Sequence, residues 1–144
     1  MRSRSGVGWL VVLVALVALS ALAGVTLARS GGPEPVSLTG SGQRFLATAE
    51  LSRAATGVIE VEIGLRRSDG SAAGDVRAVA VSGVMPAMGH VTPEIQAEPA
   101  GADRFRVRGE LFFMPGTWQL DIRVDTTSGA DVIDIEVPVE TEGN

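Results

Sequence analysis

The residues best suited to chemistry in this 144-residue chain are its methionines and its single histidine, which lie close together in the sequence. Apart from Met1, every methionine falls between residues 85 and 114, in two short segments, and so does the histidine. Thioether sulfur is a soft donor that selects Cu(I), and imidazole binds copper in either oxidation state. The pattern therefore predicts a copper site, Cu(I) preferred, with four metal ligands: Met85, Met88, His90 and Met114.

Two other interpretations of these residues stay open. Methionine is a flexible filler of hydrophobic cores, and three in a small domain are ordinary. His90 follows Gly89 and would then only complete a turn. If the two segments are exposed instead, their apolar side chains form a contact surface for another protein. The positions of the sulfurs relative to the His90 ring distinguish these cases.

Several other kinds of chemistry are excluded or disfavoured by composition. The chain has no Cys, which rules out disulfides, thiol catalysis and cysteine zinc sites. It has one His, and no Ser lies in a Gly-x-Ser-x-Gly motif. The sequence also contains no glycine-rich phosphate loop. The carboxylates are densest on the polar faces of predicted strands and match no calcium loop: Asp121, Asp125, Asp131, Asp134 and Glu136. We therefore do not expect an enzyme.

The first 29 residues predict a membrane segment. Arg2 and Arg4 precede an uncharged, mostly apolar stretch at residues 5–28, and Arg29 ends it. A bilayer core needs roughly 20 apolar residues in a helix, and leading arginines favour a cytoplasmic N-terminus. We expect a single-pass anchor in the cell membrane with an extracytoplasmic C-terminal domain. The alternative is a signal peptide that is cleaved, which leaves a secreted domain.

The rest of the chain predicts a linker at residues 30–42 and one all-β domain at residues 43–140. Apolar and polar residues alternate there with the period of a strand. The pattern is typical of an immunoglobulin-like β-sandwich of about seven strands, with Trp118 and Phe105 in its core. The expected strands cover residues 45–51, 58–65, 76–84, 94–98, 104–111, 118–124 and 132–139. Residues 85–90 and 112–116 fall between strands, so the methionines and His90 are expected on two loops.

The charge of the exported part argues against some partners. Residues 30–144 keep nine of the twelve Arg and all seventeen acidic residues, a net charge of −8. Such a domain is poorly suited to bind nucleic acid or anionic lipid.

Residues 85–90 (MPAMGH) and 104–122 (RFRVRGELFFMPGTWQLDI) together resemble the YtkA-like domain family, which is related to FixH-like proteins. The resemblance covers roughly residues 58–124. It implies a β-sandwich behind an N-terminal membrane segment, without enzymatic activity, and roles in copper handling, respiratory-oxidase assembly or metal efflux. In this resemblance Met85, Met88 and His90 match the first motif and Met114 the second, with Trp118 beneath the site.

Three functions follow as expectations. The first is a membrane-tethered module that binds copper and delivers it to a copper-accepting protein. The second is an interaction module that assembles a respiratory or efflux complex in the membrane without metal. The third, weaker expectation is a sandwich that binds a small ligand.

Overall fold

A computed structural model of the protein describes residues 35–140. The predicted membrane or signal segment at residues 1–29 and the first residues of the predicted linker lie outside this range. No helix long and apolar enough to cross a bilayer occurs within residues 35–140. Ten strands make up the described fold: β1 (Val36–Ser41), β2 (Phe45–Leu51), β3 (Gly57–Arg67), β4 (Val76–Met85), β5 (His90–Val91), β6 (Ile95–Gln96), β7 (Glu98–Gly101), β8 (Arg104–Phe112), β9 (Gly116–Thr126) and β10 (Gly129–Val139).

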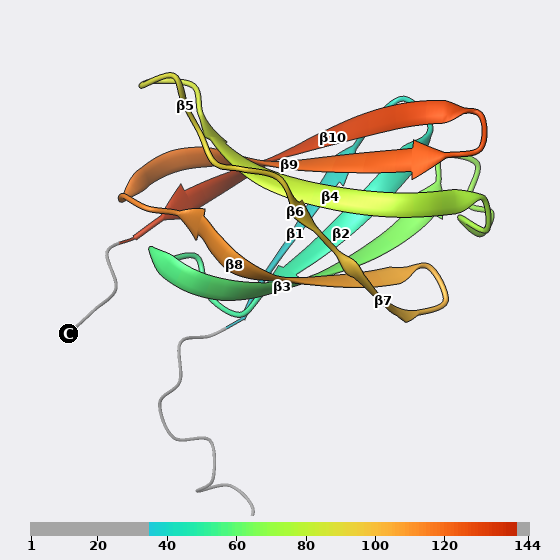
Figure 1. Cartoon of the computed structure of the whole chain (residues 1–144), viewed down its shortest axis with the longest axis horizontal. Coiled ribbons are helices and arrows are strands. Elements are labelled where there is room, and N and C mark those ends of the chain that lie inside the picture. The colour runs from blue at the N-terminus through green and yellow to red at the C-terminus, as the bar shows by residue number, and fades with distance from the viewer. Residues whose placement is uncertain (1–34, 141–144) are drawn as a thin grey trace, which may run out of the picture. The chain divides into compact units, whose positions relative to one another are not determined.

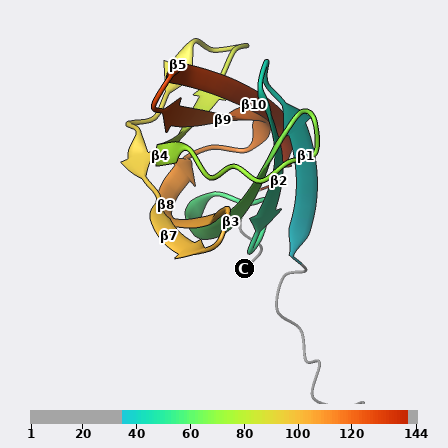
Figure 2. The same cartoon turned by 90° about the vertical axis from the view of Figure 1, so that its right-hand side faces the viewer.

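The strands form two antiparallel sheets that lie face to face (Figures 1 and 2). One sheet has the order β1-β2-β3-β8-β7, and the other has the order β10-β9-β4-β5, with β6 also paired to β4. The chain crosses from one sheet to the other after β3, after β6 and after β8. The predicted all-β class is confirmed.

The core lies between the sheets and follows the alternation in the sequence. In β2 every second residue is buried, from Phe45 to Leu51, and the residues between them are exposed. Trp118 is fully buried, as expected. Phe105 is only partly buried and packs at the margin of the core, where β8 pairs with the short β7. The expectation that Phe105 lies at the centre of the core is therefore wrong.

Two expected boundaries are also wrong. The predicted linker at residues 30–42 contains β1, which pairs with β2 along its whole length. Its inward positions include Gly40, where an added Cβ would lie 2.6 Å from Ile135, so β1 packs tightly against β10. The single strand expected at residues 94–98 is divided between the sheets: β6 pairs with β4, and β7 pairs with β8. With the short strand β5 in addition, ten strands replace the expected seven.

Asp131 is buried in β10 and holds the turn between β1 and β2. Its carboxylate accepts hydrogen bonds from the backbone N–H groups of Gln43 at 3.1 Å, Arg44 at 2.8 Å and Phe45 at 3.1 Å. Burial raises the pKa of Asp131, but these N–H groups lower it more, so the pKa lies below its ordinary value. The solvent-exposed position predicted for Asp131 is therefore wrong. Its side chain is buried and accepts hydrogen bonds from the backbone of the β1–β2 turn.

The two sheets approach each other closely near the end of β4. A Cβ added to Gly83 would lie 2.1 Å from the carbonyl oxygen of Leu111 in β8. The Gly83 N–H donates to Thr92 Oγ1 at 2.7 Å, and the Thr92 N–H donates to the Gly83 carbonyl at 2.8 Å. These contacts fix the segment after β5 against β4, and so position the hairpin that carries the first methionine motif.

Candidate metal centre

The first motif forms a tight hairpin between β4 and β5. Met85 ends β4 and His90 begins β5, and the two residues are register partners. The N–H of Met88 donates to the carbonyl of Met85 at 3.2 Å, which makes a turn with Pro86 at the position that favours proline. Gly89 has a φ of +66°, which glycine adopts without strain. The loop expected at residues 85–90 is therefore shorter, since both of its end residues belong to strands.

The second motif forms the connection between β8 and β9. The indole Nε1–H of Trp118 donates to the carbonyl of Met114 at 2.9 Å, so the buried ring holds this turn in place. Gly116 has a φ of +136°, a conformation that L side chains rarely adopt. The turn is thus fixed from below by Trp118 and shaped by Gly116.

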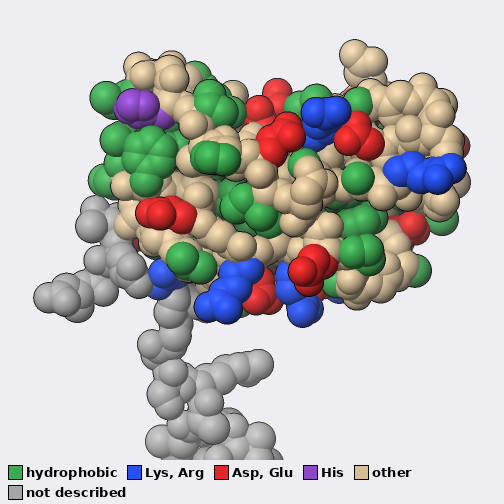
Figure 3. Space-filling model, viewed as in Figure 1, with side chains coloured by type: hydrophobic (Ala, Val, Ile, Leu, Met, Phe, Trp, Pro, Cys, Tyr) green, Lys and Arg blue, Asp and Glu red, His purple; other side chains and the backbone are tan. Residues whose placement is uncertain are grey.

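The two motifs meet at one end of the sandwich. The rings of His90 and Phe113 stack edge to face with centroids 5.3 Å apart, and Phe113 contacts Trp118 in the same way at 4.9 Å. A Cβ added to Gly116 would lie 2.9 Å from Cε of Met85. Figure 3 shows the histidine surrounded by apolar side chains at this end. Residues from two separate connections therefore become neighbours.

Burial separates the four predicted ligands. Met85 is 4% exposed and belongs to the hydrophobic core, which is the position of a core filler. Met88 is 61% exposed at the tip of the hairpin. His90 and Met114 are half-buried, and Met114 packs against the core. Three of the four are thus reachable from solvent, and Met85 lies beneath them.

No group of three or more His, Cys, Asp or Glu residues within residues 35–140 could hold a metal ion. A metal at this end would therefore depend on thioethers together with the imidazole. That donor set suits soft Cu(I) and does not suit calcium or magnesium, which require oxygen ligands.

The same end exposes further apolar side chains beside the predicted ligands. Val91 is 65% exposed and Phe113 is 43% exposed, close to Met88 in the fold. We call Met88, Val91 and Phe113 the apolar end. Phe113 belongs to the second motif, whereas Val91 belongs to neither motif, and only the position of the hairpin identifies it as part of this surface.

The acidic residues of β9 and β10 form a facing pair on the outer surface of their sheet. Asp121 and Asp134 are register partners. Burial, and then the charge of Asp134, raise the pKa of Asp121 to about 6. Oδ1 of Asp121 is buried and has no hydrogen-bond partner among the described residues. Farther along β9, Asp125 pairs with Arg123 at 3.3 Å, as expected for a solvated face.

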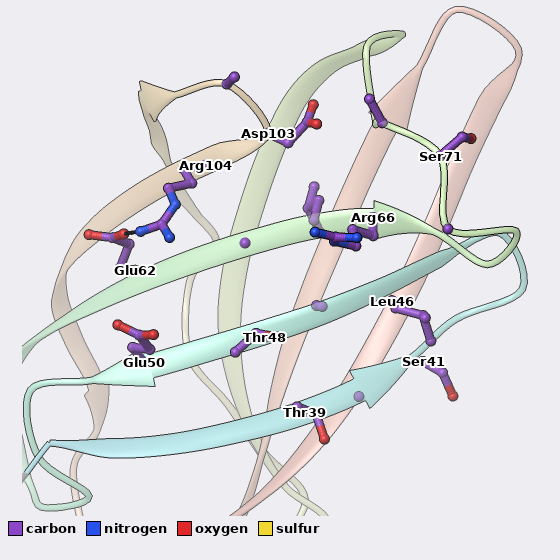
Figure 4. A pocket seen from close by; sticks show the side chains of 17 residues that line it. Thr39, Ser41, Leu46, Thr48, Glu50, Glu62, Arg66, Ser71, Asp103 and Arg104 are labelled. Atoms are coloured by element: carbon purple, nitrogen blue, oxygen red, sulfur yellow. Dashed lines mark hydrogen bonds and ion pairs between the residues drawn. The ribbon is translucent and has the colours of Figure 1, made fainter.

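A polar groove of about 950 Å³ lies on the outer face of β1, β2 and β3 (Figure 4). Hydroxyl and charged side chains line it, and Gly64 leaves open space in its floor. Arg104 forms an ion pair with Glu62 at its edge, and hydrogen bonds from Arg104 and Arg106 lower the pKa of Glu62. The groove includes none of the methionines and does not include His90.

No protein-family model, curated protein or solved structure matches this chain. The functional argument therefore depends on the composition and geometry of the site.

Proposed function

We propose that the chain is an exported, membrane-tethered module that binds copper, Cu(I) preferred, and delivers it to another protein. One observation carries the proposal: the β4–β5 hairpin and the β8–β9 connection adjoin, which brings the only histidine of the chain next to the turn that holds Met114. Three of the chain's four methionines belong to these two segments. The arrangement gives soft donors at one exposed end.

The proposed ligands are Met88, His90 and Met114 at the surface, with Met85 as an interior fourth ligand. Met85 is the register partner of His90, so the two residues lie opposite each other in the β4–β5 ladder. Thioethers and an imidazole are donors that Cu(I) accepts. Imidazole must be neutral to bind a metal, so we expect copper affinity to fall in acid.

We also infer that the sandwich is immunoglobulin-like. The order β2-β3-β8-β7 in one sheet and β10-β9-β4 in the other corresponds to the arrangement of a constant-type immunoglobulin domain, in which the sheets hold strands ABED and GFC. This order supports the predicted fold family and is compatible with the resemblance to YtkA-like domains. In this assignment β1 is an additional strand at the edge of the first sheet.

A competition titration with a chromophoric Cu(I) chelator tests the proposal. The full chain in neutral detergent should bind Cu(I) with a dissociation constant of micromolar or tighter, and both Met88→Ala and His90→Ala should weaken it at least tenfold. Val132→Ala is the matched control, because Val132 is 51% exposed and lies on β10 away from the motifs. Binding weaker than micromolar, or equal binding by all variants, would refute copper binding.

The apolar end favours a second candidate function, an assembly module for a respiratory or efflux complex that works without metal. Exposed apolar side chains in a group are typical of contact surfaces. Co-purification of a membrane complex that survives Met88→Ala and His90→Ala, and is lost with Val91→Asp, would favour this function over copper delivery.

A further inference from the structure

The two ends of the sandwich differ sharply in charge. At the apolar end, residues 84–93 and 111–118 contain no Asp, Glu, Lys or Arg, and His90 is their one titratable side chain. Charged residues flank these segments, Glu94 after the first and Glu110 before the second, and Glu140 forms a bridge to Ala55 in the β2–β3 connection. At the opposite end, the turns at residues 66–75, 101–104 and 125–131 all carry charged side chains. Only the apolar end suits a low-dielectric environment.

The chain also enters the domain nearer to the apolar end. Val36, the first residue of β1, pairs with Leu51, and Leu51 pairs with Val61. Val61 lies four residues from Gly57, where β3 begins beside the apolar end, and six residues from Arg67, where it finishes. At about 3.4 Å per residue these are distances of about 14 and 20 Å. From Val36, β1 runs away from the apolar end.

The segment that connects the predicted anchor to β1 is short. Six residues, 30–35, separate Arg29 from Val36. Even when fully extended they span only about 20 Å. If residues 1–29 anchor the chain, the apolar end therefore stays within reach of the bilayer, at a high effective concentration.

We propose that the apolar end docks on the lipid surface of the membrane that anchors the chain, with Met88, Val91 and Phe113 in the headgroup region. This rests on the membrane anchor of the proposed function and is independent of copper. Aromatic and apolar side chains are favoured at the interface. Because the exported part carries a charge of −8, the suitable lipid is neutral and not anionic.

The size of the surface favours lipid over a second protein chain. The apolar end offers three large exposed apolar side chains, whereas a stable protein interface uses about 20–30 residues of all types from each partner, so a protein partner would also have to cover the polar surface around them. A tethered domain needs far less contact area to stay on a bilayer, because the anchor already removes most of its translational freedom.

Fluorescence quenching by the bilayer tests the docking. The chain has no Cys, so single Val91→Cys and Val132→Cys variants of the full chain each accept one fluorophore. Both positions are exposed valines, 65% and 51% exposed, and their strands, β5 and β10, lie at opposite edges of the same sheet. The variants are reconstituted without copper in phosphatidylcholine vesicles that contain nitroxide-labelled headgroups.

We expect the probe at Val91→Cys to be quenched at least threefold more than the probe at Val132→Cys, and Phe113→Asp to remove most of this difference. Equal quenching of the two probes, stronger quenching at Val132→Cys, or no quenching of either would overturn the proposal. Energy transfer between differently labelled chains, without lipid quenching, would also overturn it and indicate a second copy as the occupant. Copper binding is measured separately, by titration of the unlabelled chain. The docking proposal and the copper proposal can therefore each fail while the other holds.

Discussion

Residues of the same type take opposite roles within a single turn of this protein. Met85 and Met88 are three positions apart, yet Met85 is buried in the core and Met88 projects from the hairpin tip. The reason is local: Met85 is the last inward residue of β4, and Pro86 then begins the turn. A count of soft ligands in the sequence cannot distinguish them. The accessible donors are therefore fewer than the composition implies.

The buried carboxylate of Asp131 is expected to contribute strongly to stability. Asp131→Asn leaves one oxygen where two oxygens accept hydrogen bonds from Gln43, Arg44 and Phe45. We expect the free energy of unfolding to fall by about 2 kcal/mol at pH 7, because hydrogen bonds to a charged acceptor are lost. Urea denaturation measures this change, and Glu136→Gln on the exposed face of β10 is the control.

The effect of Asp131 should depend on pH with a definite sign. Its folded pKa lies below the unfolded value, so its contribution is present above the unfolded pKa and is lost as the pH falls through the folded pKa. The difference in the free energy of unfolding between the wild-type protein and Asp131→Asn should therefore decrease only in strong acid. A difference in the free energy of unfolding that increases in acid would contradict the prediction that the ionised carboxylate stabilises the fold.

Asp121 should behave in the opposite way. Its folded pKa is raised to about 6 by burial and by Asp134, so the folded state holds a proton more tightly than the unfolded state. Stability is then lost as the pH rises from about 4 through 6. Asp121→Asn should raise the free energy of unfolding by about 1 kcal/mol at pH 7.5, a discounted figure because the side chain is partly exposed.

Denaturation at pH 4 and pH 7.5 checks this prediction for Asp121. The gain from Asp121→Asn should nearly vanish at pH 4, where the carboxyl is already neutral. Asp134→Asn should also stabilise the protein at pH 7.5, and the double variant should gain less than the sum of the two. Destabilisation by Asp121→Asn at pH 7.5 would mean that the charged form is preferred.

At the scale of elements, the contact between β4 and β8 joins the two sheets beside the candidate site. Gly83 has no room for a side chain, because an added Cβ would lie 2.1 Å from the backbone oxygen of Leu111. We expect Gly83→Ala to cost about 3 kcal/mol, since the backbone must move to relieve the overlap. Thermal unfolding measures the change.

Gly64→Ala is the matched control for this contact. Gly64 lies within β3, and a Cβ there meets no heavy atom within 4 Å. Alanine should be neutral or stabilise the protein by about 0.5 kcal/mol, because it restricts the unfolded chain. Equal effects of the two substitutions would show that the sheets are not held closely at Gly83.

The elements that the sequence predicts well are those with strict alternation. Six of the seven expected strands coincide with strands of the fold, and the strand at residues 45–51 has the observed limits of β2, whereas the strand expected at residues 94–98 is divided between β6 and β7. The alternation of apolar and polar residues does not show which strand each segment pairs with. β1 looks like a linker because its inward positions include Gly40, and the division between β6 and β7 depends on which sheet each segment can reach.

The candidate site was predictable in part for the same reason. Residue type and spacing identify the soft ligands, and both motifs do adjoin at one end of the fold. The burial of Met85 and the exposure of Val91 depend on the position of the hairpin relative to the second sheet. The role of Asp131 depends on a turn that lies 87 residues earlier in the chain, at Arg44. No local pattern contains such long-range contacts.

At the scale of the whole molecule, copper binding should stabilise the folded domain, because the proposed ligands come from two connections that only folding brings together. A ligand at about 100 times its dissociation constant stabilises the native state by about 2.7 kcal/mol, which for a domain of this size raises Tm by on the order of 10 °C. Differential scanning fluorimetry of the full chain under reducing conditions, with and without Cu(I), measures this shift. His90→Ala should remove most of the increase in Tm, and the control Val132→Ala should retain the increase. If Cu(I) instead lowers Tm, the methionines bind the metal better in the unfolded chain, and the adjoining connections are then a hydrophobic contact and not a metal centre.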